Sequence, residues 1–206
     1  MIDDGVIKFK LTMRLGEPPR LDEVLPLERW RAILWRLRLI GEYPTDRVGY
    51  GNISARLPNS RGLFLISGTQ TGRHAHLRRE QYTRVQECDL SRGSVTATGA
   101  IGPSSESLTH HAIYLAHSEI AAVFHIHHRG LWEALIASDA PAVSAGIPYG
   151  TTEMAAAARE LIGQSSEGFF VMKGHQDGIV SYGPSAEVAG KTILKLYREL
   201  GPQEVL

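Results

Sequence analysis

Apolar residues recur along this chain at two periods, which predict a mixture of helices and strands. Trp30, Ile33, Leu34 and Leu37 follow the three- and four-residue spacing of an amphipathic helix, which we expect over 27–40. Further helices are expected at 104–117, 130–137, 153–162 and 184–200. Strands are expected at 6–13, 62–66, 92–98, 121–127, 168–173 and 178–182, and the stretch 43–54 is rich in turn residues.

The order of these elements favours one α/β domain in which helices cover a sheet. Two pairs of strands look like hairpins, so the sheet is expected to be mixed or antiparallel. No internal repeat, low-complexity tract or linker divides the chain. We therefore expect an N-terminal extension at 1–26, followed by a single domain at 27–206.

Composition narrows the class of protein. The 206 residues are 43% apolar and 21% charged, which argues against a disordered or membrane-spanning chain. Lys plus Arg and Asp plus Glu both number 22, and this zero net charge argues against general nucleic-acid binding. The acidic start and the lack of a long apolar stretch predict a cytoplasmic protein with no membrane partner. Cys88 is the only cysteine, which rules out an internal disulfide and a cysteine-based zinc site.

The strongest candidate for chemistry is the pair His125 and His127, in an apolar run expected to form a strand. Side chains two residues apart on a strand share a face, so the imidazoles are expected side by side, with Phe124 and Ile126 packed behind them. Two imidazoles held in this way form half of a transition-metal site. His128 should point to the other face and is not expected to bind the same ion. The alternative is that these are hydrogen-bonded histidines of the core or surface.

Residues 102–106, with the sequence Gly-Pro-Ser-Ser-Glu, stand where a helix is expected to begin. Hydroxyls and free backbone N–H groups at a helix N-terminus form a ready anion site. Glu106 could ligate a metal there or act as a general base beside one. The alternative is an ordinary helix cap with an acidic first turn.

Other polar loops offer a further histidine and anion-binding groups. His175 precedes Asp177-Gly178, which is typical of a hairpin turn, and could deliver a third imidazole. Residues 49–54 and 67–69 combine glycine with Asn, Ser and Thr, which can bind a phosphate. The first of these fails as a dinucleotide fingerprint, because Ser54 stands where the third glycine belongs. No Gly-x-Ser-x-Gly elbow is present, and a second His-x-His at 74–76 lies in an arginine-rich stretch expected to be exposed.

The order of these segments resembles the class II aldolase/adducin family over about 27–200 of the chain. The matching segments are Gly-Asn-Ile-Ser at 51–54, Ser-Gly at 67–68, Ser-Ser-Glu at 104–106 with His110 soon after, His-x-His at 125–127, and the late His175. The resemblance implies a three-layer α/β/α domain with a central mixed, largely antiparallel sheet. It also implies homo-oligomers, commonly tetramers, with active sites between subunits.

The resemblance further implies a divalent metal, most often Zn²⁺ with Mn²⁺, Fe²⁺ or Co²⁺ as alternatives, and a small phosphorylated or carboxylated substrate. Glu106 matches the acidic residue that serves as base in the aldolases. The implied metal ligands are His125, His127 and His175. The implied substrate-binding residues are Asn52, Ser67, Gly68, Ser104 and Ser105.

The implied function is a metal-dependent lyase that cleaves a sugar phosphate or related hydroxy-carbonyl compound through an enediolate. Decarboxylases, epimerases and dehydratases on the same fold are alternatives, as is a non-catalytic, adducin-like interaction module.

Two departures from the family pattern leave alternatives open. The third histidine is usually followed by glycine, so Asp177 competes with His175 as ligand. The aldolases carry a catalytic tyrosine in the stretch that corresponds to 140–146, where this chain has none. Tyr149 is near but out of register, and Tyr197 from another copy is a candidate proton donor.

Overall fold

A computed structural model describes residues 5–58 and 62–201. The first four residues of the expected N-terminal extension, and residues 59–61 and 202–206 of the expected domain, lie outside the described part. The helices are α1 (Leu21–Arg36), α2 (Ser107–Ala116), α3 (Arg129–Ala137), α4 (Thr152–Ile162) and α5 (Ala186–Leu200), with a short 3-10 helix at Arg79–Gln81. The strands are β1 (Lys10–Arg14), β2 (Gly41–Glu42), β3 (Gly49–Tyr50), β4 (Asn52–Arg56), β5 (Phe64–Ser67), β6 (Tyr82–Asp89), β7 (Ser94–Thr98), β8 (Ala122–His127), β9 (Ala142–Val143), β10 (Gly168–Met172) and β11 (Gly178–Gly183).

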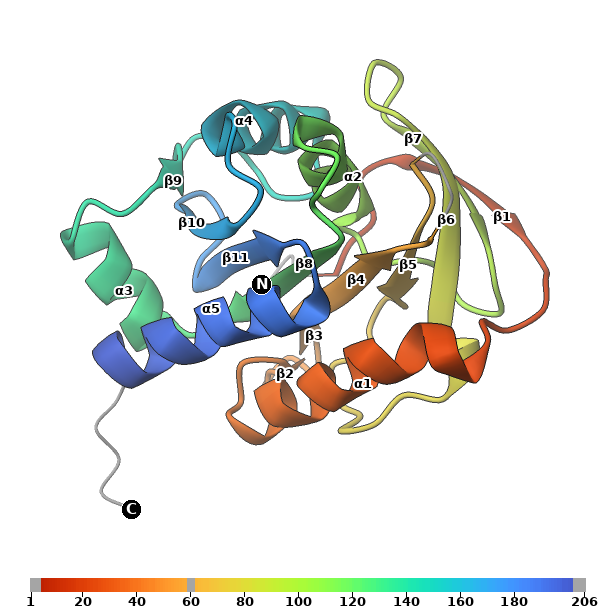
Figure 1. The fold of residues 1–206 in the computed structure, drawn as a ribbon, viewed down its shortest axis with the longest axis horizontal. Coiled ribbons are helices and arrows are strands. Elements are labelled where there is room, and N and C mark those ends of the chain that lie inside the picture. Colours follow the sequence, from red (N-terminus) through yellow and green to blue (C-terminus); the bar gives the residue numbers. More distant parts are fainter. Residues whose placement is uncertain (1–4, 59–61, 202–206) are drawn as a thin grey trace.

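The central sheet has nine strands in the order β1-β7-β6-β5-β4-β8-β11-β10-β9 (Figure 1). Only its two outermost pairs, β1 with β7 and β10 with β9, are parallel. The prediction of a mixed, largely antiparallel sheet is therefore confirmed. Strands β2 and β3 form a separate antiparallel hairpin beside the sheet.

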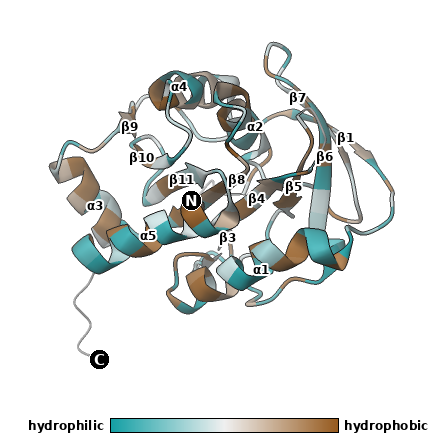
Figure 2. Ribbon diagram, in the orientation of Figure 1, coloured by the Kyte–Doolittle hydropathy of each residue, from teal (hydrophilic) through white to brown (hydrophobic). Residues whose placement is uncertain are grey.

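Helices cover both faces of the sheet, which confirms the predicted three layers. Alternate residues of β8 show the division, because Val123 packs into the cluster that includes α2 and α4. Phe124 and Ile126 pack instead into the cluster formed with α1, α3 and α5. In Figure 2 the central strand β5 is mostly hydrophobic, while the covering helices carry both kinds of residue. Burial of these two apolar layers supplies most of the free energy that favours the fold.

The first helix begins earlier than predicted, at Leu21 instead of residue 27. The Glu23 carboxylate accepts a hydrogen bond of 2.6 Å from the backbone N–H of Arg20, which stabilises the first turn. Pro26 lies inside the helix, where proline is normally unfavourable, and this made the true start hard to predict.

Periodicity does not predict three strands of the central sheet: β4, β6 and the two-residue β9. β4 contains only two apolar residues, Ile53 and Ala55, and lies in the stretch that was expected to be turns. β6 has a register shift between Val85 and Glu87, which breaks the alternation that marks a strand.

The last helix begins later than predicted, at Ala186 instead of residue 184. The Ser185 hydroxyl caps it by accepting a hydrogen bond of 3.2 Å from the Val188 N–H, so Pro184 precedes the helix instead of lying in its first turn.

Leu39, which follows α1, is fully buried within the chain. Among the described residues, no helix is long and apolar enough to cross a membrane.

Candidate metal centre and substrate pocket

Strand β8 brings two imidazoles together on the face of the sheet that α2 and α4 cover. Every residue of β8 is buried, and the exposed fractions of His125 and His127 are 1% and 4%. Their Nε2 atoms lie 2.9 Å apart, and their rings are nearly perpendicular at 82°. Phe124 and Ile126 project to the opposite face, where they anchor the strand in the second apolar cluster.

The turn between β10 and β11 supplies the third imidazole. The ring centroid of His175 lies 5.1 Å from that of His125 and 4.6 Å from that of His127. One ring nitrogen of each histidine lies within 4.8 Å of the others. Among the described residues this group consists of the three histidines, without Asp177. The φ of Asp177 is 66°, and its backbone carbonyl accepts a hydrogen bond from the His128 N–H.

The histidine group fits a divalent transition metal in its donor chemistry. Two nitrogens bound to one tetrahedral zinc ion at 2.0–2.1 Å lie about 3.3 Å apart, close to the separation of the His125 and His127 Nε2 atoms. Burial, with a smaller effect of the two neighbouring imidazoles, holds the pKa of His127 well below its usual range. That ring is therefore neutral, as a ligand must be.

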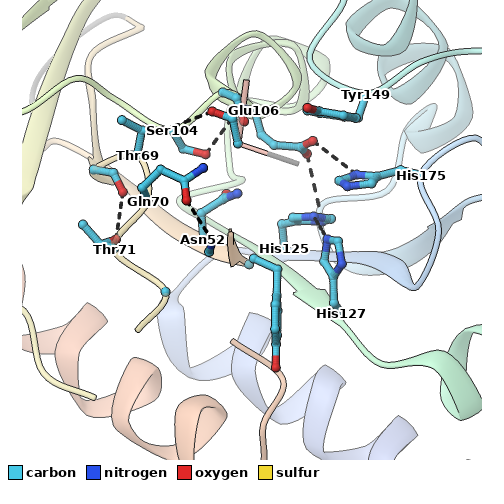
Figure 3. A pocket seen from close by; sticks show the side chains of 17 residues that line it. Asn52, Thr69, Gln70, Thr71, Ser104, Glu106, His125, His127, Tyr149 and His175 are labelled. Atoms are coloured by element: carbon cyan, nitrogen blue, oxygen red, sulfur yellow. Dashed lines mark hydrogen bonds and ion pairs between the residues drawn. The ribbon is translucent and has the colours of Figure 1, made fainter. Parts of the chain in front are cut away.

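Glu106 lies beside the Nδ1 atoms of two of these histidines (Figure 3). Its Oε1 is 3.4 Å from the His175 Nδ1 and its Oε2 is 4.0 Å from the His125 Nδ1. Burial alone raises the pKa of this carboxyl, but His125, the hydrogen bond from His175, and His110 outweigh burial and lower the pKa to about 2. Glu106 is therefore an ionised, buried base beside the imidazoles.

The loop before α2 aims Glu106 into the pocket. The helix begins at Ser107 with Glu106 as its N-cap, which corrects the prediction that Ser104 and Ser105 cap it. The Ser104 hydroxyl instead accepts a hydrogen bond of 3.3 Å from the Glu106 N–H, and the Ser107 hydroxyl donates one of 2.7 Å to the Ser104 carbonyl. This turn holds the Glu106 carboxylate at the N-terminus of α2.

One side of the pocket is formed by polar residues, which we call the polar wall; they include Asn52, Thr69, Gln70, Thr71 and Ser104. The polar wall faces the histidines across Glu106 (Figure 3). Of the predicted substrate-binding residues, Asn52, Gly68, Ser104 and Ser105 line this pocket. The Asn52 Oδ1 is buried and has no hydrogen-bond partner among the described residues, so it is available to a ligand. In the described part of the lining there is no lysine or arginine, so an anion here would be held by backbone N–H groups, hydroxyls and the amide.

Ser67 does not line the pocket, although its neighbour Gly68 does. Its hydroxyl accepts a hydrogen bond of 3.2 Å from the Ile53 N–H and so joins β5 to β4. The structure gives this serine a place in the sheet.

Several lining residues were missed or only partly anticipated from sequence. They are Gly5, Thr69, Gln70, Thr71, Gly72 and Tyr149. For the loop at 69–72, the sequence signal was its run of Thr, Gln and Gly. The glycine is needed because a Cβ at Gly72 would lie 1.9 Å from the Gly41 carbonyl oxygen, so the two backbones meet there. Tyr149 stacks on His175 with ring centroids 4.4 Å apart, a contact between segments that no local pattern reveals.

The other histidines considered lie outside the metal group. The His128 Nδ1 accepts a hydrogen bond of 3.0 Å from the Leu131 N–H and caps α3, and the ring of Tyr197 packs edge-on against His128. His76 has a side chain that is 76% exposed. His110 is fully buried, with its Nδ1 atom 2.7 Å from the Ser54 hydroxyl oxygen.

Similarity to known proteins identifies the family of this chain. No curated protein sequence matches the chain. Its fold is similar to that of L-fuculose-1-phosphate aldolase from Thermus thermophilus, with a TM-score of 0.63 at 20% identity, over 87% of this chain and 91% of that one. YgbL from Klebsiella pneumoniae, whose description names aldolase, epimerase and decarboxylase together, gives 0.63 at 20% identity, over 89% and 92%. A sugar-phosphate aldolase from Thermotoga maritima gives 0.60 at 18% identity, over 90% and 97%. The model of the class II aldolase and adducin N-terminal domain matches residues 31–198, so the chain belongs to the class II aldolase and adducin family.

Proposed function

We propose that this protein is a divalent-metal-dependent lyase that cleaves the carbon–carbon bond of a small hydroxy-carbonyl compound carrying a phosphate or carboxylate. The observation that carries the proposal is the position of Glu106 between the three imidazoles and the polar wall. An interaction module has no need for an ionised carboxylate buried at such a junction.

In the proposed site His125, His127 and His175 would hold the metal, for which Zn²⁺ is the first choice. When bound, such an ion acts as a Lewis acid and stabilises negative charge that develops on a substrate oxygen. The Glu106 carboxylate transfers the proton at the carbon next to the substrate carbonyl. In the direction of bond formation it removes this proton, and the former aldehyde oxygen takes up a proton to become a hydroxyl. In cleavage that hydroxyl gives up its proton, and Glu106 delivers one to the carbon.

The polar wall would hold the anionic end of the substrate. Asn52 and Ser104 lie on two elements that converge on the pocket, and the backbone of Gly68 approaches from a third. These neutral donors fit a phosphate or a carboxylate, and they fix the reacting carbon relative to Glu106. We also propose a homotetramer, which is the assembly that the resemblance to the class II aldolases implies.

Epimerase, decarboxylase and dehydratase activities form the second candidate. They are favoured by the stretch 140–146, which has no tyrosine to take the proton from the hydroxyl that becomes the aldehyde on cleavage. Tyr149 is committed to stacking on His175 within the same chain. The proton step at Glu106 is common to an aldolase and an epimerase, so the overall product distinguishes them.

The test is exchange of the carbon-bound protons of dihydroxyacetone phosphate, the three-carbon product expected from cleavage of a ketose 1-phosphate. The zinc-loaded protein is incubated with this compound in D₂O, and the exchange is followed by proton NMR. We expect deuterium to enter at the hydroxymethyl carbon, with loss of exchange after chelation. A metal-loaded protein that exchanges no proton would contradict the lyase proposal and favour a decarboxylase or an interaction module. L-Fuculose 1-phosphate and other ketose 1-phosphates then separate cleavage from epimerisation.

A further inference from the structure

The Nδ1 atom of each imidazole in the histidine group lies near an oxygen atom, and one of these oxygens belongs to a residue outside the predicted site. Glu106 lies against the Nδ1 atoms of His125 and His175. The Nδ1 of His127 lies instead 2.7 Å from the hydroxyl oxygen of Tyr43, a residue 84 positions earlier in the chain.

Tyr43 reaches His127 because the β2–β3 hairpin is fixed in place. Gly41 pairs with Tyr50, and the Tyr43 N–H donates a hydrogen bond of 2.9 Å to the Val48 carbonyl. The segment just before the hairpin bonds to the same histidine, since the His127 backbone N–H donates to the Leu39 carbonyl at 2.9 Å. Backbone and ring of His127 are thus both held by residues 39–43.

Aromatic contacts restrict the orientation of the two rings that make this bond. The ring of Tyr43 packs on that of Tyr50 with centroids 4.6 Å apart, and it meets the His127 ring edge-on at 69°. The Tyr50 ring also lies against His127, with centroids 5.4 Å apart. The hydroxyl of Tyr43 therefore has little freedom to leave the His127 nitrogen.

The direction of the hydrogen bond follows from the chemistry of a ligand. The Nε2 of His127 points at the Nε2 of His125, so this atom must offer a lone pair to a bound metal. A neutral imidazole carries one proton, which then resides on Nδ1. That N–H donates to the Tyr43 hydroxyl oxygen, which fixes the tautomer and the plane of the ring.

We propose that Tyr43 is a positioning residue for the metal centre, which sets the tautomer and orientation of His127. The inference rests on the metal site of the proposed function. Two ligands share an ionised carboxylate and the third has a neutral phenol, so Tyr43 orients His127 without adding negative charge to the centre.

The experiment compares Tyr43→Phe with Tyr50→Phe. Tyr43→Phe keeps the ring and removes the hydroxyl that faces His127. Tyr50→Phe is the matched control in the same hairpin, because its hydroxyl bonds to the Arg38 carbonyl at 3.2 Å and not to His127. Zinc affinity is measured by competition with a chromophoric chelator, and urea unfolding of the metal-free proteins establishes that all three are folded.

We expect Tyr43→Phe to weaken zinc binding by roughly 10- to 100-fold, the usual cost of losing an outer partner of a metal-bound histidine. Tyr50→Phe should stay within about threefold of the wild type. An unchanged affinity in Tyr43→Phe would overturn the inference and leave the metal site standing. Equal losses in both variants would also overturn it, because they would trace the effect to packing of the hairpin. Failure of the wild type to bind zinc would refute the proposed metal site itself.

A second measurement reads the proton directly in the unmodified protein. Long-range ¹H–¹⁵N NMR of the zinc-loaded wild type should show His127 protonated at Nδ1, with an N–H signal protected from exchange with water. In Tyr43→Phe that signal should broaden or disappear, which a purely structural role would not cause. A wild-type His127 protonated at Nε2 would overturn the inference.

Discussion

Asn52 and His125 stand directly opposite each other in the neighbouring antiparallel strands β4 and β8. Side chains of opposite residues project from the same face of a sheet, so the amide proposed to bind substrate and an imidazole proposed to bind metal lie side by side. The two halves of the site are therefore held by one rigid ladder, although 73 positions separate these residues. This geometry lets a small molecule contact both halves at once.

Glu106→Gln should abolish proton transfer while preserving the pocket. The amide is nearly isosteric but cannot accept a proton, so we expect turnover or deuterium exchange to fall by roughly 10²- to 10⁴-fold. Metal content at saturating zinc should be retained. The exposed Glu119→Gln serves as control. Near-normal exchange in Glu106→Gln would show that another group is the base.

A fall in activity at low pH should not result from protonation of Glu106. Because its pKa is lowered to about 2, this carboxylate stays ionised throughout the range from pH 5 to pH 8. Any loss of activity on acidification within that range should coincide with loss of metal, because metal affinity depends on pH. Zinc content measured in parallel with the rate separates the two causes.

Gly178→Ala should weaken metal binding although it replaces no ligand. A Cβ at this position would lie 3.1 Å from the His125 Cε1 and 3.3 Å from the His175 Cγ, so it would press on both rings. We expect zinc affinity to drop roughly tenfold or more. The exposed Gly146→Ala, where a Cβ would meet nothing within 4 Å, is the matched control. Equal affinities in both variants would contradict the close packing of the histidines.

Asn52→Ala and Ser67→Ala should distinguish a residue that binds substrate from one that stabilises the sheet. Loss of the Asn52 amide should weaken binding of the substrate anion by about tenfold, since one hydrogen bond to a charged group is lost. Ser67 bonds to the Ile53 N–H, so its replacement should cost about 1 kcal/mol of unfolding free energy and leave substrate KM unchanged. Urea unfolding and KM are measured for both. A raised KM in Ser67→Ala would return this residue to the binding site.

The metal-free protein should lose stability as the pH falls below about 6.5. Burial lowers the pKa of His110 to about 3 and, with Arg56 and Arg159, lowers the pKa of His111 to about 4. Between those values and 6.5 the unfolded chain binds more protons than the folded one, so the unfolding free energy decreases on acidification. At pH 5 each histidine should account for about 2 kcal/mol of this loss.

Urea unfolding at pH 7.5 and pH 5.0 in the presence of a chelator measures this difference. His111→Leu should reduce it by about 2 kcal/mol, because the titrating group is gone. The variant at the exposed His76, His76→Gln, should behave as the wild type. A pH difference that is the same in His111→Leu and in the wild type would contradict the assignment.

Local patterns were enough to predict the strand that carries His125 and His127. Alternation along a strand is a property of neighbouring residues, and here the apolar partners Phe124 and Ile126 fix which face the imidazoles take. The same holds for α5, whose apolar residues recur at helical spacing. Strand β6 could not be predicted in this way, because its register shift interrupts the alternation.

The remaining parts of the site depend on contacts between distant segments. β4 lies beside β8, and the β2–β3 hairpin meets the end of β8, only because of the order of strands in the sheet. Neither the bond from Tyr43 to His127 nor the stacking of Tyr149 on His175 leaves a trace in the spacing of residues. Nor does the spacing of residues reveal that the Ser67 hydroxyl accepts a hydrogen bond from the Ile53 N–H of the neighbouring strand.

The most direct test of the central claim is the metal content of the purified protein. The chain is stripped with a chelator, incubated with zinc, desalted and analysed for bound metal. We predict about one ion per chain for the wild type and less than about a tenth of that for His125→Ala/His127→Ala. The other His-x-His pair provides the control, as His74→Ala/His76→Ala should bind as the wild type does. A wild-type protein without stoichiometric metal, or equal binding by both double variants, would contradict the account.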